Sequence, residues 1–161
     1  MTISRLSHPF PPLYDSQSAV LILGSFPSVK SRESQFFYGH PQNRFWRVIA
    51  ALMEEPVPIS IAEKKRLILS HHLALWDAVQ SCTITGSSDS SIKDVVPNDL
   101  SGIIANSRID RIFCNGTLSH NVYQRYIRPT IGREAVKLPS TSPANAAYSL
   151  EKLLAAWRVI L

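Results

Sequence analysis

The chain has 161 residues, 45% of them apolar, with a formal net charge of +5 and an isoelectric point near 9.5. This size suits one domain that buries roughly 70% of its unfolded surface without a disulfide or a metal, and no stretch approaches the roughly 20 apolar residues of a membrane span. The basic charge makes nucleic acid the first candidate partner.

The two cysteines, Cys82 and Cys114, stand far apart and have neither CxxC nor Cys/His spacing. The sequence therefore lacks the ligand pattern of a zinc or iron–sulfur site and of a disulfide framework. Reduced thiols fit the cytoplasm, where we expect the protein to act.

The first elements can be read from composition and apolar spacing. Residues 1–18 are polar and rich in proline, which predicts a surface arm ahead of the first strand. The apolar run at 19–23 (AVLIL) stops at Gly24 and is typical of a strand buried on both faces of a parallel sheet. Apolar residues at helical spacing then predict an amphipathic helix over 41–55, with Pro41 at its first position.

The rest of the chain alternates helix and strand patterns. Helices are expected at 61–72, 99–106, about 117–126 and after Ser142, strands at 73–77, 111–114 and 135–138, and a long polar, functional loop at 82–98. This alternation implies right-handed βαβ crossovers, so the fold class is α/β, with a parallel sheet covered by helices on both faces.

Polar segments follow the predicted strands at 24–28, Asp77, 115–116 and 139–143. Ligands of such sheets bind at the carboxyl ends of the strands. We therefore expect these segments to meet in one crevice.

The turn QFFYGHPQNRFW at 35–46 is unusually rich in rings and amides. At a helix start, Asn43 can orient a water or bond a base edge, and Tyr38 can stack on a base for roughly 1 to 3 kcal/mol. His40 can bond a substrate, although a turn histidine is the ordinary interpretation. The alternative for the whole turn is a plain helix start with aromatic side chains packed into the core.

The segment LPSTSPANAA at 138–147 has the pattern of a second helix start, with Ser142 as the cap, Pro143 at the first helical position and Asn145 in the first turn. Serine hydroxyls and backbone N–H groups there can grip DNA phosphates, and Arg44 and Arg47 are further phosphate candidates. An ordinary capped helix is the alternative.

Five segments occur in the order found in one known family: GSFPS (24–28), YGHPQNRFW (38–46), LWDAVQSC with GSSDSSI (75–92), FCNG (113–116) and LPSTSPANA (138–146). Together they resemble the uracil-DNA glycosylase superfamily, most closely its hypoxanthine-DNA (deoxyinosine) glycosylase branch. The resemblance implies a three-layer α/β/α single domain over 1–161 with a four-stranded parallel sheet. It also implies a DNA glycosylase of base excision repair that acts on DNA without metal or cofactor. Because no lysine stands in a matching segment as a Schiff-base nucleophile, we expect a monofunctional enzyme, and we expect it to act as a monomer. Such an enzyme flips out a deaminated base, here hypoxanthine first and uracil or xanthine next, and leaves an abasic site.

The resemblance assigns Asn43 as the catalytic residue that positions the attacking water. In and beside the matching segments, the base-binding candidates are Ser25, Phe26, Tyr38, His40 and Asn115, and the DNA-binding candidates are Ser28, Lys30, Arg44, Arg47, Ser140, Thr141, Ser142, Pro143 and Asn145.

Two alternatives stay open. The fold and the charge also suit a module that binds nucleotides or single-stranded nucleic acid without catalysis. A hydrolase triad of Ser25, His40 and Asp77 is the other alternative, although GSFPS lacks the G-x-S-x-G elbow. Outside such a triad, Asp77 and Asp89 are either general bases or caps.

Overall fold

The protein is built around a four-stranded parallel sheet with strand order β3-β2-β6-β7. The computed structural model describes residues 3–85 and 91–161. The strands are β2 (Val20–Gly24), β3 (Leu73–Asp77), β6 (Arg111–Asn115) and β7 (Val136–Leu138). Leu21, Ile22 and Leu23 are fully buried, as expected for a strand covered on both faces. The predicted α/β class and the parallel sheet are confirmed.

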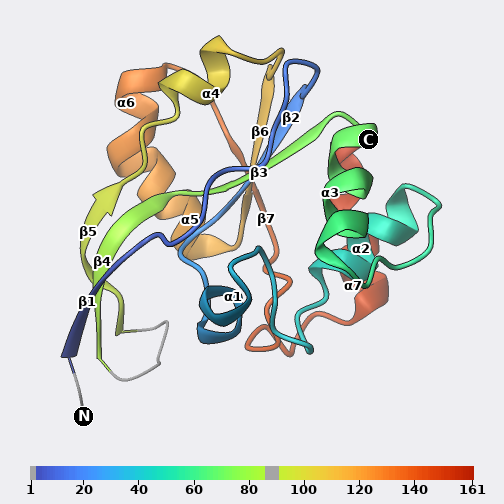
Figure 1. The fold of residues 1–161 in the computed structure, drawn as a ribbon, viewed down its shortest axis with the longest axis horizontal. Coiled ribbons are helices and arrows are strands. Elements are labelled where there is room, and N and C mark those ends of the chain that lie inside the picture. The colour runs from blue at the N-terminus through green and yellow to red at the C-terminus, as the bar shows by residue number, and fades with distance from the viewer. Residues whose placement is uncertain (1–2, 86–90) are drawn as a thin grey trace.

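Helices cover both faces of this sheet (Figure 1). They are α1 (Val29–Ser34), α2 (Phe45–Leu52), α3 (Ile61–Ser70), α4 (Ser101–Ala105), α5 (Thr117–Val122), the π-helical turn η2 (Tyr123–Ile127), α6 (Arg128–Ile131), α7 (Leu150–Trp157) and the short 3-10 turn η3 (Arg158–Ile160). One face carries α2, α3 and α7, where Phe45 meets Trp157 edge-on at 6.0 Å between ring centroids. The other face carries α4, α5 and α6. Within 3–85 and 91–161, no helix has the length and apolar character needed to cross a membrane.

A second, antiparallel sheet was not predicted. Its order is β1-β4-β5, formed by β1 (Ile3–Ser7), β4 (Val79–Thr85) and β5 (Lys93–Pro97). The expected surface arm therefore supplies a strand, and the expected loop at 82–98 is wrong, because most of its described part is strand. The reason is that β4 alternates buried and more exposed positions with small polar side chains, a weak period-2 signal. Residues 86–90, including Asp89, lie outside the described residues.

Two predicted helix starts are also wrong. Helix α2 begins at Phe45 rather than at Pro41, because the Asn43 side-chain oxygen accepts a hydrogen bond from the Phe45 N–H (2.9 Å) and holds a turn. Helix α7 begins at Leu150 with Ser149 as its cap, and residues 142–148 form turns. Asn43, Pro143 and Asn145 therefore stand in loops, outside the first helical turns in which they were expected.

Candidate functional site

A cavity of about 310 Å³ opens at the carboxyl ends of the parallel strands. It is lined by Gly24, Ser25, Phe26, Pro27, Ser28, Ser31, Phe37, Tyr38, His40, Asn43, Asp77, Asn115, Ser140, Thr141, Ser142, Pro143 and Ala144. The volume falls at the lower end of the roughly 300 to 1,000 Å³ typical of small-molecule sites. The predicted crevice is confirmed, since the ends of β2, β3 and β6 and the loop after β7 all reach it.

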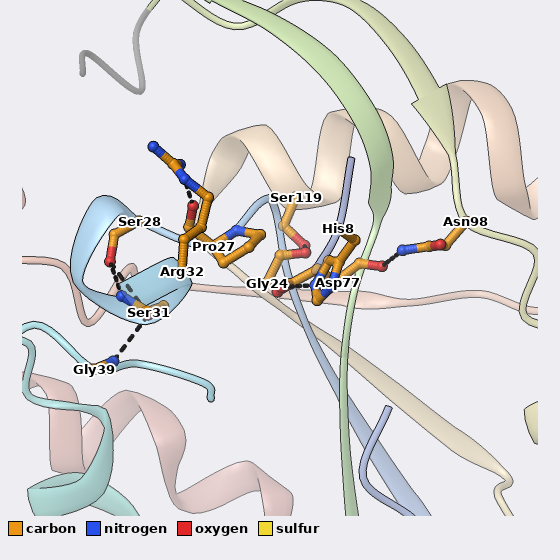
Figure 2. Close-up of polar contacts among 10 residues, drawn as sticks. All are labelled: His8, Gly24, Pro27, Ser28, Ser31, Arg32, Gly39, Asp77, Asn98 and Ser119. Atoms are coloured by element: carbon orange, nitrogen blue, oxygen red, sulfur yellow. Dashed lines mark hydrogen bonds and ion pairs between the residues drawn. The ribbon is translucent and has the colours of Figure 1, made fainter. Parts of the chain in front are cut away.

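One wall of the cavity is held together by serine side chains. The Ser28 hydroxyl caps α1 by accepting from the Ser31 N–H (3.3 Å), and the buried Ser31 hydroxyl accepts from the Gly39 N–H (2.9 Å), as Figure 2 shows. Arg32 donates to the Pro27 carbonyl at 2.8 Å. The loop after β2 and the turn around Gly39 are therefore fixed to one another through α1. Ser31 was not singled out from the sequence.

Tyr38 lies in this wall with a left-handed backbone (φ 52°). Its ring stacks on Phe45 with 3.9 Å between centroids and 18° between planes. Its buried hydroxyl has no hydrogen-bond partner among the described residues. Burial raises the pKa of Tyr38 and the nearby Asp77 carboxylate raises it further, whereas the Asn115 amide, which lies near the hydroxyl but is hydrogen-bonded to Thr141, opposes the shift. The hydroxyl is therefore protonated at neutral pH, and one face of the ring is already covered.

Asn43 and His40 both line the cavity, and the backbone orients both. Because the Asn43 Oδ1 accepts from the Phe45 N–H, its Nδ2 and one lone pair of Oδ1 are left for a ligand. His40 Nδ1 lies 3.1 Å from the Gln42 N–H and accepts from it. In the neutral ring the proton is then on Nε2, which makes Nε2 a donor.

The loop after β7 is clamped to β6 by Asn115. The Asn115 Nδ2 donates to the Thr141 hydroxyl, and its Oδ1 accepts from the Thr141 N–H, both at 3.0 Å. Thr141 is fully buried. Asn115 therefore fixes the loop after β7 to the carboxyl end of β6.

Arg44 and short local bonds hold the rest of that loop. The Arg44 guanidinium donates to the carbonyls of Ser142 (2.9 Å), Asn145 (3.1 Å) and Tyr148. Ser140 Oγ accepts from the Ser142 N–H (3.1 Å), and Asn145 Nδ2 donates to the Ser140 carbonyl (3.0 Å). Arg44 was expected to bind phosphate, and its contacts show it supporting this loop.

The floor of the cavity contains a pair that sequence reasoning missed. Asp77, the last residue of β3, bonds through Oδ2 to Nε2 of His8 at 2.7 Å, beside Gly24 (Figure 2). Only 2% of the His8 side chain and 6% of the Asp77 side chain are exposed. His8 follows β1 in the segment expected to be a surface arm, so only the tertiary fold brings it here. No local pattern could have found it.

Comparison with known proteins fits this geometry. The family model described as the uracil DNA glycosylase superfamily matches residues 11–160. The chain belongs to this superfamily. A Methanosarcina acetivorans protein named hypoxanthine DNA glycosylase is 36% identical over 141 residues, covering 87% of this chain and 89% of the relative. A Methanosarcina barkeri protein of the same name is 31% identical over 152 residues, covering 92% and 93%.

A solved structure supports the same conclusion. The solution NMR structure of a protein from Methanosarcina acetivorans, described as a candidate uracil DNA glycosylase, superposes with a TM-score of 0.80 at 31% identity. The match covers 99% of both chains. The fold of this superfamily member therefore extends over the N-terminal segment that carries His8.

The structure brings most candidate residues of this superfamily member together. Those not lining the cavity are Lys30, Arg44, Arg47 and Asn145. Lys30 is exposed and pairs with Glu33 at 3.5 Å, and Arg47 is exposed on α2. Asn145 lines an adjoining open groove of about 700 Å³, together with Leu118, Lys137 and Tyr148.

The hydrolase triad is not assembled. Asp77 pairs with His8, and His40 accepts from the Gln42 backbone through the nitrogen that a relay would use. Among the described residues, no group of three or more His, Cys, Asp and Glu side chains is placed to hold a metal ion.

Proposed function

We propose that the protein is a monofunctional DNA glycosylase that hydrolyses the bond between deoxyribose and a flipped, deaminated base and leaves an abasic site. Hypoxanthine is the first expected base, and uracil and xanthine are next. The observation that carries this proposal is the open cavity of about 310 Å³, in which amide, hydroxyl and aromatic groups from separate segments line one space. The names of the two relatives, which cover nearly the whole chain, support the same base class.

Asn43 is the proposed catalytic residue. The bond from Phe45 N–H to Asn43 Oδ1 fixes the amide plane, so that the second Oδ1 lone pair can accept a hydrogen from the attacking water. As the glycosidic bond lengthens, DNA phosphates stabilise the oxocarbenium-like sugar, and N–H donors meet the charge on the leaving base. The loop 24–28 contains no carboxylate, and the Asp77 carboxylate in the cavity floor is bonded to His8, so in this proposal catalysis rests on positioning and electrostatics.

The flipped base is held by groups that line the cavity. Phe26 and Tyr38 supply ring surface, His40 can donate from Nε2, and Ser25 adds a hydroxyl. Asn115 acts on the base pocket mainly through its clamp on the loop after β7.

The DNA backbone lies along the mouth of the cavity in this proposal. Ser28, Ser140, Ser142 and Pro143 line that mouth, and neutral donors there can bind phosphates as Arg and Lys do. Lys30 and Arg47 extend the contact over the exposed surface, Asn145 extends it into the adjoining groove, and Arg44 and Thr141 hold the loop in shape. We propose that the protein binds DNA as a monomer in the cytoplasm.

The test is an excision assay with EDTA present, using labelled duplexes that carry one hypoxanthine or one uracil. We expect strand breaks at hypoxanthine only after alkali, because a monofunctional enzyme leaves the abasic strand intact. Asn43→Ala is expected to lower the single-turnover rate by about 100- to 1,000-fold, the size of effect seen when one positioned polar group is removed.

Two controls accompany this assay. Asn106→Ala removes an exposed amide that caps α4 through the Gly102 carbonyl (2.7 Å), and excision should stay within about twofold, since surface changes have small effects. Asn43→Asp keeps an oxygen for the Phe45 N–H and a lone pair for the attacking water, so it should recover much of the rate, and thermal unfolding of Asn43→Ala shows whether loss of the fold explains its lower rate. DNA binding without release of any base from the wild-type chain would leave only the binding-module alternative.

A further inference from the structure

The Asp77 carboxylate is a nearly buried hydrogen-bond acceptor on the floor of the cavity. It stands at the carboxyl end of β3 and lines the cavity. Its Oδ2 is occupied by His8, whereas its Oδ1 lies directly over Gly24, only 2.3 Å from the position that a Cβ there would take. The glycine therefore makes room for this oxygen, which His8 leaves available to a ligand.

His8 sets Asp77 as a hydrogen-bond acceptor. Its ring is enclosed by aromatic side chains, with centroid distances of 4.3 Å to Trp76, 4.6 Å to Phe10 and 6.0 Å to Phe26. Within the described residues its Nδ1 is buried without a hydrogen-bond partner. A proton on Nδ1 would leave a buried N–H group without an acceptor in an apolar environment, which is unfavourable. The proton of the neutral ring is therefore on Nε2, which donates it to Asp77.

Such an acceptor can read the atom that deamination changes. Adenine N1 and cytosine N3 are bare acceptors, whereas the same ring nitrogens in hypoxanthine and uracil carry a hydrogen beside a new carbonyl. A carboxylate oxygen attracts the N–H and repels the bare nitrogen lone pair, and in a buried site both effects are strong. Guanine also has N1–H, so this contact separates hypoxanthine from adenine and uracil from cytosine.

We propose that Asp77 is the specificity-determining residue of the base pocket, accepting the ring N–H of a deaminated base through Oδ1, and that His8 is the positioning residue that keeps Asp77 an acceptor. This inference rests on the proposed glycosylase function and adds the chemical feature by which the substrate is selected. It also gives the N-terminal segment a part in the site, because β1 pairs with β4 and the His8 N–H donates to the Gln80 carbonyl at 2.7 Å.

The test measures equilibrium binding of the full chain to duplexes that cannot be cleaved. Each duplex carries one 2′-fluorinated nucleotide whose base is either hypoxanthine, with N1–H, or unsubstituted purine, with a bare N1. Asp77→Asn should weaken binding of hypoxanthine by roughly 10- to 100-fold, the value of a hydrogen bond to a charged group. Binding of purine should stay the same or become tighter, because Asp77→Asn removes the repulsion between the carboxylate and the bare N1 lone pair.

His8 is tested by a pair of variants. His8→Phe keeps an aromatic ring but removes the donor, and it should reduce the preference for hypoxanthine over purine as Asp77→Asn does. His8→Gln restores an N–H donor to Asp77 and should recover most of the preference. Thermal unfolding of each variant checks that the fold is kept.

Each outcome separates this inference from the proposed function. Equal losses for both bases in Asp77→Asn, or no loss for either, would overturn the role of Asp77. A His8→Phe variant that keeps the full preference would overturn the role of His8. A parallel excision assay on the unfluorinated hypoxanthine duplex tests the glycosylase function itself, since base preference in binding does not depend on cleavage.

Discussion

The floor and the rim of the cavity are built in different ways. The floor consists of Gly24, Asp77 and Asn115, and the side chains of Asp77 and Asn115 are hydrogen-bonded to segments far away in the sequence. The rim consists of Ser28, Ser140, Ser142, Pro143 and Ala144, where the serine hydroxyls accept from backbone N–H groups two or three residues away. A change in the floor should therefore alter stability and chemistry together. A change at the rim or outside it should mainly alter DNA affinity.

Gly24→Ala should give the largest effect. The new Cβ would lie 2.3 Å from Asp77 Oδ1 and 3.0 Å from the Tyr38 hydroxyl, so both groups must move. We expect about 1 to 3 kcal/mol of destabilisation from overpacking. Excision should fall by about 100-fold or more, since a shift of about 1 Å in a positioned group can have that effect. Urea unfolding and single-turnover excision measure the two quantities.

Gly102→Ala is the matched control for that change. Gly102 lies in α4, and a Cβ there meets nothing within 4 Å. This variant should gain about 0.4 to 1 kcal/mol of stability and keep its activity. If Gly24→Ala behaved like Gly102→Ala, the floor would be far more compliant than its geometry indicates.

Asn115→Ala should give the next largest effect, because it removes the two hydrogen bonds that join Asn115 in the floor to the loop after β7. It leaves the buried N–H and hydroxyl of Thr141 without their partner, which costs about 2 kcal/mol. We expect about a tenfold loss of excision as the loop after β7 loosens, which corresponds to about 1.4 kcal/mol. Hydrogen exchange at the Thr141 amide reports the release directly.

Asn115→Asp provides the comparison. A carboxylate can still accept from the Thr141 N–H and from its hydroxyl, so stability should be largely kept. An unchanged exchange rate at Thr141 in Asn115→Ala would show that the Arg44 bonds alone hold the loop.

The same contrast explains what the sequence could predict. The rim and the wall were visible because Ser28, Tyr38, Asn43 and Ser140 belong to contiguous motifs, and the apolar run at 19–23 indicated a doubly covered strand. The boundaries of the helices were wrong because the side chains of Asn43 and Ser142 bond to nearby backbone N–H groups and hold turns in place of helix.

The floor residues were also named from the sequence, but the pairing of Asp77 with His8 was missed for a different reason. The distance from His8 to Asp77 is 69 residues along the chain, and the pair forms only because β1 joins an antiparallel sheet whose strands are short and polar. A contact of this kind depends on register between strands, and apolar periodicity carries no information about it.

Arg47→Ala examines the surface outside the rim and should have a smaller effect. Arg47 is exposed on α2, and a phosphate contact made there should contribute a few-fold in affinity and about one unit in the slope of log affinity against log salt. Stability and the excision rate at saturating protein should not change. Binding titrations at several salt concentrations measure the slope.

Arg108→Ala is the control, since Arg108 precedes β6 at the amino ends of the parallel strands, away from the cavity, and bonds to Gln17 at 3.1 Å. Equal slopes for both variants would indicate a diffuse basic charge rather than a defined DNA path beside the cavity.

Tyr38→Phe should give the smallest effect, and a pH-dependent one. Burial raises the pKa of Tyr38 above the value of about 10 expected in the unfolded chain. Below pH 10 both the folded and the unfolded state carry the proton on Tyr38, and above pH 10 only the folded state does, so the wild type should lose up to about 1.4 kcal/mol of stability per pH unit from this group.

At pH 8 the variant should differ from the wild type by less than about 1 kcal/mol in stability, because the lost hydroxyl has no partner among the described residues. Urea unfolding at pH 8, 10 and 11 should therefore show that the free energy of unfolding of the variant rises relative to that of the wild type as the pH rises. A constant difference would mean that the Tyr38 hydroxyl reaches water, and that this part of the wall is open to solvent.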